Sequence, residues 1–222
     1  MNKKYNLFFL VALFISSLAT KAQNNPDFTL ASNGVTCLCP DANFGDTGTL
    51  TINGVQKTFT KRTRAELDAI IYDNIYDLRI AFTCTSGITD MSRLFEQKTQ
   101  FNQNLEHWDV SNVTNMSGMF QGLDDFNQPL NNWDVSNVTS MSVMFWATSS
   151  FNQPLNNWDV SSASTMTGMF YNSAFNKPLN NWDVSSVTNM QSMFENSSFN
   201  QPLNNWDVSS VTNMTRMFGG IP

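Results

Sequence analysis

The sequence predicts an α/β solenoid: a right-handed stack of 24–25-residue coils, each with a short parallel strand and a short helix or 3₁₀ turn, behind a small α+β cap. Residues 101–218 repeat one motif five times, and the repeated tryptophans lie 25, 25, 24 and 24 residues apart. A half-copy, ITDMSRLF, precedes them in the same register at residues 88–95. A fixed period of this length is typical of repeats that stack only on their neighbours. Such architectures usually bind or space other molecules and seldom catalyse.

Residues 1–22 have the pattern of a secretory signal peptide. Lys3 and Lys4 give a basic start, residues 7–15 are an apolar run of nine, and Thr20-Lys21-Ala22 fits a small-residue cleavage site. Nine apolar residues are too few to span a bilayer, and the sequence contains no second long apolar run. No cysteine closely follows the apolar run. We therefore expect a protein that is secreted or at the cell surface, without membrane insertion and without an N-terminal lipid anchor.

The charge balance disfavours several classes of partner. The leader holds three of the 12 Lys and Arg residues and none of the 18 Asp and Glu residues, so the mature chain has nine basic against 18 acidic residues, a balance near −9. An acidic surface disfavours nucleic acid and anionic membranes. The sequence shows no nucleophile–base set, no phosphate loop and, beyond His107, no histidine. We expect no enzyme activity, no cofactor and no metal site.

Residues 23–87 do not repeat and are expected to cap the first coil. Gly45–Thr60 predicts a β-hairpin, because Asn53-Gly54 is a strong hairpin turn between two strand-like runs. Thr63–Leu78 predicts a helix that begins with a capping box of Thr63 and Glu66. Its apolar stripe has helical spacing and consists of Leu67, Ile70, Ile71, Ile75 and Leu78. The repeat region then spans residues 88–222, with one half-repeat and five full repeats.

The cysteines predict one disulfide. Cys37, Cys39 and Cys84 allow three pairings and leave one thiol over. An exported chain meets oxidising conditions. We favour Cys39–Cys84, which would tie the start of the cap to the first repeat and contribute ~4 kcal/mol by closing that loop.

Within a coil the apolar positions are fixed. Leu130-x-x-Trp133-x-Val135 predicts a short strand with Trp133 and Val135 pointing inward. Ser136-Asn137 is expected to turn, and residues 138–145, with apolar residues at i, i+3, i+6 and i+7, favour one or two turns of helix or 3₁₀ helix. Burying the apolar side chains of a single coil does not offset the conformational entropy that the coil loses on becoming ordered. Contacts between stacked coils must therefore supply the remaining free energy.

The repeat x-NxPLxxWDVSxVTxMxxMF over residues 88–218 resembles that of bacterial BspA-like leucine-rich-repeat surface proteins. Residues 33–36, 45–48 and 84–87 of the preceding segment also resemble that family. The resemblance implies a leucine-rich-repeat-like fold, export to the surface, and adhesion or partner binding, with no enzyme activity. In this chain Trp133 and its equivalents replace the second Leu of the usual repeat, and the Asn that usually follows the turn is missing.

The repeat also predicts a candidate binding surface. On a strand, the Asp of each Trp-Asp-Val-Ser segment would point away from the core, flanked by Asn and Ser on a flat ribbon. A ribbon of this kind suits an extended protein surface or a sugar, and the alternative is a solvated face without a ligand. Each Asp is expected to accept hydrogen bonds within its own turn rather than to hold Ca²⁺. The ribbon consists of Asn132, Asp134, Ser136, Asn157, Asp159, Ser161, Asn181, Asp183, Ser185, Asn205, Asp207 and Ser209.

Three further columns have expected roles. The repeat tryptophans are expected in the core rather than on a sugar-binding platform. The asparagines Asn127, Asn152, Asn176 and Asn200 are expected to form a buried ladder that satisfies turn carbonyls between coils. Trp146 and Tyr171 follow the Met-Phe pair in a variable part of the repeat and are candidate contact residues.

These observations favour a secreted or cell-surface binding or adhesion module that contacts protein or extracellular matrix through a repeat face, with glycans as a further partner class. The alternatives are a structural spacer in a longer surface protein and a carbohydrate-binding solenoid. Residues 217–222 follow a repeat core without a recognisable cap. We therefore expect either a fragment of a longer protein or a partner that covers that end.

Overall fold

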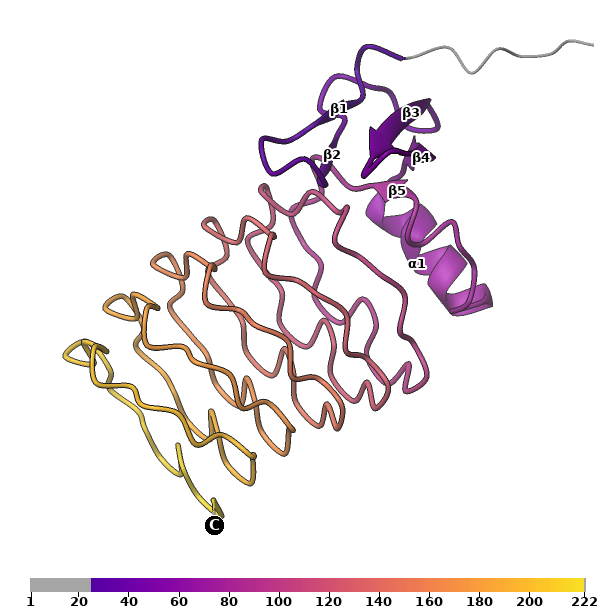
Figure 1. Ribbon diagram of the computed structural model, residues 1–222. Helices are drawn as coiled ribbons and strands as arrows, with labels where there is room; N and C mark the ends of the chain where they lie inside the picture. The colour runs from indigo at the N-terminus through magenta and orange to yellow at the C-terminus, as the bar shows by residue number, and fades with distance from the viewer. Residues whose placement is uncertain (1–24, 222) are drawn as a thin grey trace, which may run out of the picture.

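The computed structural model describes residues 25–221, and the predicted leader at residues 1–22 lies outside the described residues. The chain forms a small N-terminal unit of short strands and one helix, followed by coils that lie side by side in a row (Figure 1). Strand β1 (Thr29–Leu30) pairs antiparallel with β2 (Cys37–Leu38). A second sheet has the order β3-β4-β5.

The predicted hairpin is confirmed. Strand β3 (Thr47–Ile52) pairs antiparallel with β4 (Val55–Lys61), and Ile52 faces Val55 across the turn. Asn53 and Gly54 have φ of 51° and 77°, the left-handed pair that a two-residue hairpin turn requires. Strand β5 (Thr83–Cys84) adds in parallel to β4 and leads the chain into the first coil.

The predicted helix is confirmed but is shorter than expected. Helix α1 (Arg64–Asp73) begins with the capping box of Thr63 and Glu66, and it buries Leu67, Ile70 and Ile71. The prediction that it continues to Leu78 is wrong, because the helix ends at Asp73; Leu78 lies in the turns beyond it and is 66% exposed. Asn74 ends the helix: its side-chain oxygen accepts the backbone N–H of Tyr76, an alternative to the helical bond that short polar side chains offer.

The path of each coil differs from the prediction. None of residues 88–221 lies in a strand longer than one bridge or in a helix. The predicted strand at Leu130–Val135 is irregular backbone and a turn, and residues 138–145 do not form a helix. The coils pair through isolated parallel bridges, in which Ser140 joins Asn115 on one side and Thr165 on the other.

Left-handed residues explain why this segment is not a helix. Val143 and Ala147 have φ of 51° and 53°, whereas a helix needs φ near about −63°. The positive φ values point the N–H groups of alternate residues toward the next coil. Met141, Val143 and Phe145 donate to carbonyl oxygens of that coil at 3.1, 2.8 and 2.9 Å, respectively. The hydrogen bonds that a helix would make within itself are thus made between coils.

The core consists of columns of equivalent side chains, and the expectation that the tryptophans are core residues is confirmed. Trp133, Trp158 and Trp182 are 2–3% exposed, whereas Trp206 in the last coil is half-buried. The indole N–H of each of these four donates to a Leu carbonyl of the preceding coil, for example Trp158 to Leu130 at 2.8 Å. The indole N–H of Trp108 donates to the carbonyl of Ile80. The phenylalanines stack in register, and the rings of Phe145 and Phe170 lie 5.6 Å apart and 3° from parallel.

Candidate binding surface

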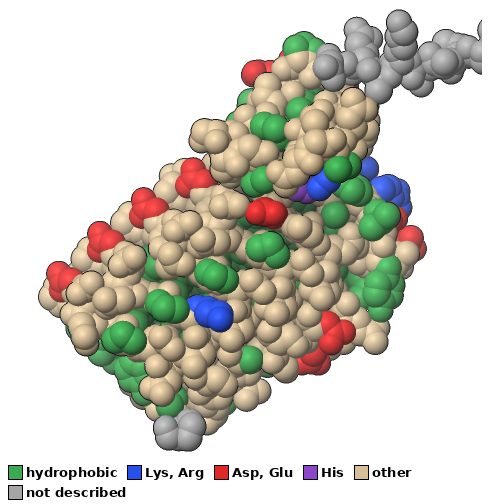
Figure 2. All heavy atoms as spheres, viewed as in Figure 1, with side chains coloured by type: hydrophobic (Ala, Val, Ile, Leu, Met, Phe, Trp, Pro, Cys, Tyr) green, Lys and Arg blue, Asp and Glu red, His purple; other side chains and the backbone are tan. Residues whose placement is uncertain are grey.

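The predicted ribbon residues lie at one edge of the stack, in the turns and irregular backbone on either side of each tryptophan. The prediction of a flat sheet face is wrong, because these residues belong to turns and irregular backbone and to no sheet. We call this edge the turn ridge; its residues are Asn132, Asp134, Ser136, Asn157, Asp159, Ser161, Asn181, Asp183, Ser185, Asn205, Asp207 and Ser209. All are exposed or half-buried. Figure 2 shows acidic side chains spaced along the upper left edge of the coils.

Each aspartate of the turn ridge organises its own turn, as expected. Asp134 Oδ1 accepts the backbone N–H of Ser136 at 3.1 Å and its hydroxyl at 2.6 Å. The same two bonds recur at Asp159 and Asp183. Among the described residues, Oδ2 of these aspartates takes part in none of the hydrogen bonds. The ridge therefore presents one carboxylate oxygen per coil, while the hydroxyls of Ser136, Ser161 and Ser185 are already engaged.

The turn geometry favours the charged form of two ridge carboxylates, those of Asp183 and Asp207. The hydroxyl and backbone N–H of Ser185 lower the pKa of Asp183 below its usual value. The backbone N–H and hydroxyl of Ser209 lower the pKa of Asp207, and the neighbouring charge of Asp183 opposes that shift. A hydrogen bond to the charged form favours that form. The ridge is consequently anionic at neutral pH.

Two hollows open on the ridge. One of about 310 Å³ lies between neighbouring coils and is lined by Asn181, Asp183, Asn205 and Asp207 among others. The other, of about 360 Å³, lies between the cap and the first coils, where Asn33 and Thr36 face Asp109, Asn132 and Asp134. Both hollows combine carboxylates with amide groups, which can receive hydrogen bonds from a partner and donate to it.

The first coil is built differently because it carries the cap. Asp109 is 5% exposed and accepts the hydroxyl of Ser86, so the ridge begins only at Asp134. His107 replaces the ridge asparagine; its Nδ1 lies 3.0 Å from the carbonyl oxygen of Val35 and its Nε2 lies 2.6 Å from Lys57 Nζ. Burial, followed by the nearby Lys57 ammonium, lowers the pKa of His107. Sequence reasoning missed this contact, although the change from Asn to His in the first copy was a signal of it.

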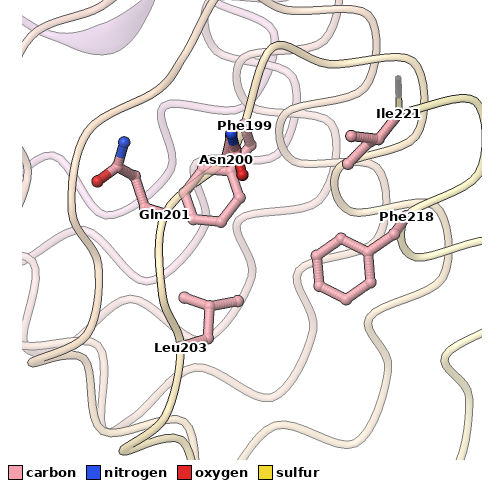
Figure 3. Close-up of a pocket in the computed structure, with 6 residues that line it drawn as sticks. All are labelled: Phe199, Asn200, Gln201, Leu203, Phe218 and Ile221. Atoms are coloured by element: carbon pink, nitrogen blue, oxygen red, sulfur yellow. The ribbon is translucent and has the colours of Figure 1, made fainter.

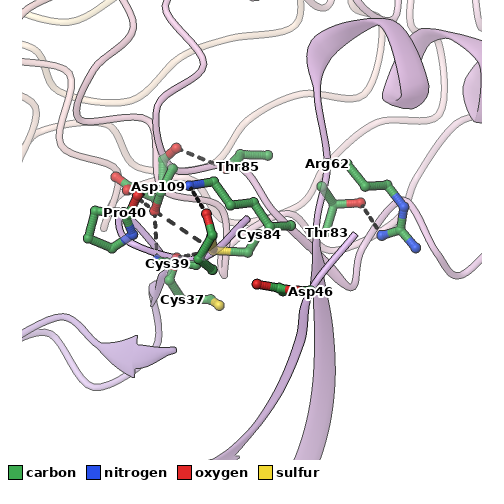
Figure 4. Close-up of a disulfide and its surroundings, with 12 residues drawn as sticks. Cys37, Cys39, Pro40, Asp46, Arg62, Thr83, Cys84, Thr85 and Asp109 are labelled. Carbon is green, nitrogen blue, oxygen red and sulfur yellow. Dashed lines mark hydrogen bonds between the residues drawn. A yellow bond between two sulfur atoms is a disulfide. The ribbon is translucent and has the colours of Figure 1, made fainter. Parts of the chain in front are cut away.

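The disulfide prediction is confirmed. Cys39 and Cys84 are bonded, with Cα atoms 6.4 Å apart, and the bond joins the cap to the segment that enters the first coil (Figure 4). Buried Lys61 beside it donates to the carbonyls of Pro40 and Ala42 at 2.9 Å each. Cys37 is the free, buried thiol, and burial, with a contribution from Asp109, raises its pKa to about 12. A thiol in this state is unreactive.

The asparagine ladder is present with a different bonding pattern. Asn127 Oδ1 accepts the backbone N–H of Asn152 at 3.0 Å, and Asn152 Oδ1 accepts that of Asn176 at 2.9 Å. The ladder therefore satisfies backbone N–H groups, not carbonyls. Its members are half-buried or exposed, so the expectation of a buried ladder is wrong.

An apolar hollow lies at the last coil. It has about 370 Å³ and is lined by Phe199, Asn200, Gln201, Leu203, Phe218 and Ile221 (Figure 3). Phe218 is 51% exposed, whereas its equivalents Phe145 and Phe170 are fully buried. The difference arises because the inner rings have a coil on each side.

Residues 25–221 contain no group of three or more His, Cys, Asp or Glu side chains placed to hold a metal ion. Within the same residues, no helix has the length and apolar character needed to cross a membrane.

A stack of near-identical coils with a polar repeated edge and a disulfide-tied cap defines a repeat protein. The chain belongs to the family described as Mycoplasma protein of unknown function, DUF285, which matches residues 67–174 and 165–221. No curated protein and no solved structure matches the chain.

Proposed function

We propose that this protein is an exported, right-handed leucine-rich-repeat-like solenoid of the BspA-like type, and that it binds protein or extracellular-matrix partners along the turn ridge. The proposed role is binding and not catalysis. The observation that carries the proposal is the regular exposure of one Asp carboxylate per coil, with a free Oδ2 and an asparagine beside it. A surface that repeats in register suits a partner with repeated or extended binding groups, since weak contacts then add through multivalency.

The anionic ridge selects partners by charge. Exposed carboxylates separated from compensating cations attract Lys- and Arg-rich surfaces, and that attraction weakens as salt screens it. We therefore expect the partner to present a basic segment, and binding to weaken between 50 mM and 500 mM salt.

The test replaces the ridge charges without disturbing the turns. Asp134, Asp159, Asp183 and Asp207 are changed together to Asn, whose Oδ1 can still accept the serine donors. The matched control changes four exposed aspartates off the ridge to Asn: Asp41, Asp73, Asp124 and Asp125. Binding to immobilised fibronectin, laminin and collagen is measured by surface plasmon resonance. The proposal predicts a loss of at least tenfold in affinity for the ridge variant and little change for the control.

Equal loss in both variants would mean that net charge alone governs binding, and an unchanged ridge variant would place the site elsewhere. Either result refutes the ridge as the binding surface, as does a failure of all three matrix proteins to bind the wild-type chain.

A structural spacer is the second candidate, favoured by the uninterrupted ladder of hydrogen bonds between coils. Met116, Met141 and Met166 each donate to the following coil at 3.0–3.1 Å. A stack linked in this way is stiff along its axis and can hold other parts at a fixed distance. A chain that binds none of the matrix proteins but keeps a rod-like shape in small-angle scattering would favour the spacer over the binding module.

A further inference from the structure

One surface column of the repeat contains residues that the rest of the pattern does not explain. It is formed by the residue after the last Phe of each coil, and we call it the post-Phe column. Its members are Glu96, Gln121, Trp146, Tyr171, Glu195 and Gly219. The buried columns of the inner coils keep Trp, Met and Phe because packing requires them. At a position that is polar in three other coils, two neighbouring coils carry aromatic rings.

The two rings form a pair at the surface. Trp146 is 36% exposed, Tyr171 is half-buried, and their ring centroids lie 4.6 Å apart with planes tilted by 42°. The Tyr171 hydroxyl accepts a hydrogen bond from Asn196 Nδ2 at 3.4 Å, which holds the ring toward the next coil. Unlike the five repeat tryptophans, Trp146 does not donate its indole N–H to any atom of the described chain. That donor is available to a ligand.

Gly168 leaves space beside the pair. Gly118 and Gly168 occupy the left-handed position two residues before the Phe of their coils, with φ of 65° and 59°. In other coils the same position is Arg93 or Ser192, each with φ of 55°, so the backbone does not demand glycine there. A Cβ on Gly168 would lie 3.7 Å from Trp146 Cε3. A longer side chain at that position would extend across the indole.

The centre of this surface carries no charge. The flanking charges are paired with each other: Arg93 with Glu96 at 3.6 Å on one side, and Arg216 with Glu195 at 3.5 Å on the other. The chain as a whole has a net charge of −6, which repels anions. Asn196, an amide, donates to the Tyr171 hydroxyl. The column neighbours of the pair are Gln121 on one side and Glu195, already paired with Arg216, on the other. A neutral ligand rich in hydrogen-bonding groups fits these surroundings.

The exposed area limits the size of the ligand. A buried aromatic side chain covers about 150–250 Å², so 36% exposure of Trp146 leaves an area on the order of 90 Å². A stable protein interface buries about 800 Å² on each partner. The aromatic pair is thus about one ring in extent. Its negative ring faces attract weakly positive C–H groups, which the flat face of a sugar ring presents together with a rim of hydroxyls.

We infer that Trp146 and Tyr171 bind one pyranose ring of a neutral oligosaccharide, with Trp146 as the stacking residue and the amides of neighbouring coils as hydrogen-bond partners. This site is separate from the turn ridge, and the two can succeed or fail independently.

The test follows the indole N–H resonances of ¹⁵N-labelled protein during titration with four neutral hexaoses: those of β-1,3-glucose, β-1,4-glucose, α-1,4-glucose and N-acetylglucosamine. Trp146→Phe assigns the Trp146 signal. We expect at least one hexaose to shift that signal saturably while the buried indoles stay in place. Trp146→Ala should weaken binding at least tenfold, and Gly168→Gln, which keeps both rings but covers them, should do the same.

The control variant is Tyr72→Ala, which removes an aromatic ring that is 86% exposed on the cap. It should bind as the wild type does, and so should the chain with the four ridge aspartates changed to Asn. The inference is refuted if no hexaose shifts the Trp146 signal, if Trp146→Ala retains binding, or if tetramethylammonium competes for the same signal more strongly than any sugar, since the site would then be a cation site.

Discussion

The stacked phenylalanines allow a direct test of whether coils stabilise one another. Phe145 is fully buried, and its ring has neighbours in its own and both adjacent coils: Phe151 at 4.3 Å, Phe120 at 5.4 Å and Phe170 at 5.6 Å. Replacing a buried Phe by Ala typically costs about 3–5 kcal/mol. Because the cavity in Phe145→Ala would be closed on both sides by stiff coils, we expect a value in the upper half of that range.

Phe218 is the matched control, because it occupies the equivalent position with a single stacked neighbour. It is 51% exposed and its ring lies 5.7 Å from that of Phe194. Because only about half of the Phe218 side chain is buried, Phe218→Ala should lower the free energy of unfolding by half as much as Phe145→Ala or less, about 1–2 kcal/mol. Urea denaturation followed by circular dichroism and by tryptophan fluorescence measures both variants. Equal destabilisation of the two would refute the idea that inner coils gain their stability from neighbours on both sides.

Three further predictions concern the cap and the ridge. Removing the disulfide by Cys39→Ser and Cys84→Ser together should lower the free energy of unfolding by about 4 kcal/mol, measured as a shift of the urea midpoint. In the wild-type chain, the Cys37 thiol should resist iodoacetamide when folded and react with it in urea. His107 has a lowered pKa, so the unfolded chain binds its proton more readily; stability should be full above about pH 6.5 and fall as pH decreases toward the folded-state pKa. His107→Asn should remove that dependence, and the single histidine resonance should titrate below its ordinary value. Ser185→Ala should raise the pKa of Asp183 by removing its hydroxyl donor, as followed by carboxyl ¹³C NMR, and an unchanged pKa would contradict the turn mechanism.

Local chemistry made much of the cap predictable. The hairpin follows from Asn53-Gly54, and the start of α1 follows from Thr63 and Glu66, because both signals act over a few residues. The end of α1 was harder to predict. The stripe from Leu67 continues in sequence through Leu78, but the side chain of Asn74 competes for the backbone and turns the chain away.

The path of the coils was less predictable than their core. Trp133 and Val135 are buried as their spacing predicts, since any compact coil must enclose its apolar residues. The left-handed φ of Val143 and Ala147 could not be read from the sequence, because residues other than glycine, and β-branched ones above all, rarely adopt it. The conformation is supported by the neighbouring coils, which accept the N–H groups that it turns outward. Contacts such as Lys57 with His107 were missed for a related reason: they join segments 50 residues apart.

The two proposed surfaces differ in how the repeat relates to their chemistry. Duplication copies every position equally, so a column that stays constant while other columns diverge is explained either by packing or by a need for the same group in every coil. The turn ridge has such a constant column, and its Asp134 Oδ1 has a structural task while Oδ2 has none. Substitution to Asn separates the two tasks, because it keeps the acceptor and removes the charge. The aromatic pair at Trp146 and Tyr171 is the opposite case. It occurs in two adjacent coils only, so it can bind a ligand of one ring but not a repeated partner. A glycan that bound every coil equally would therefore contradict the assignment of that pair as the sugar site.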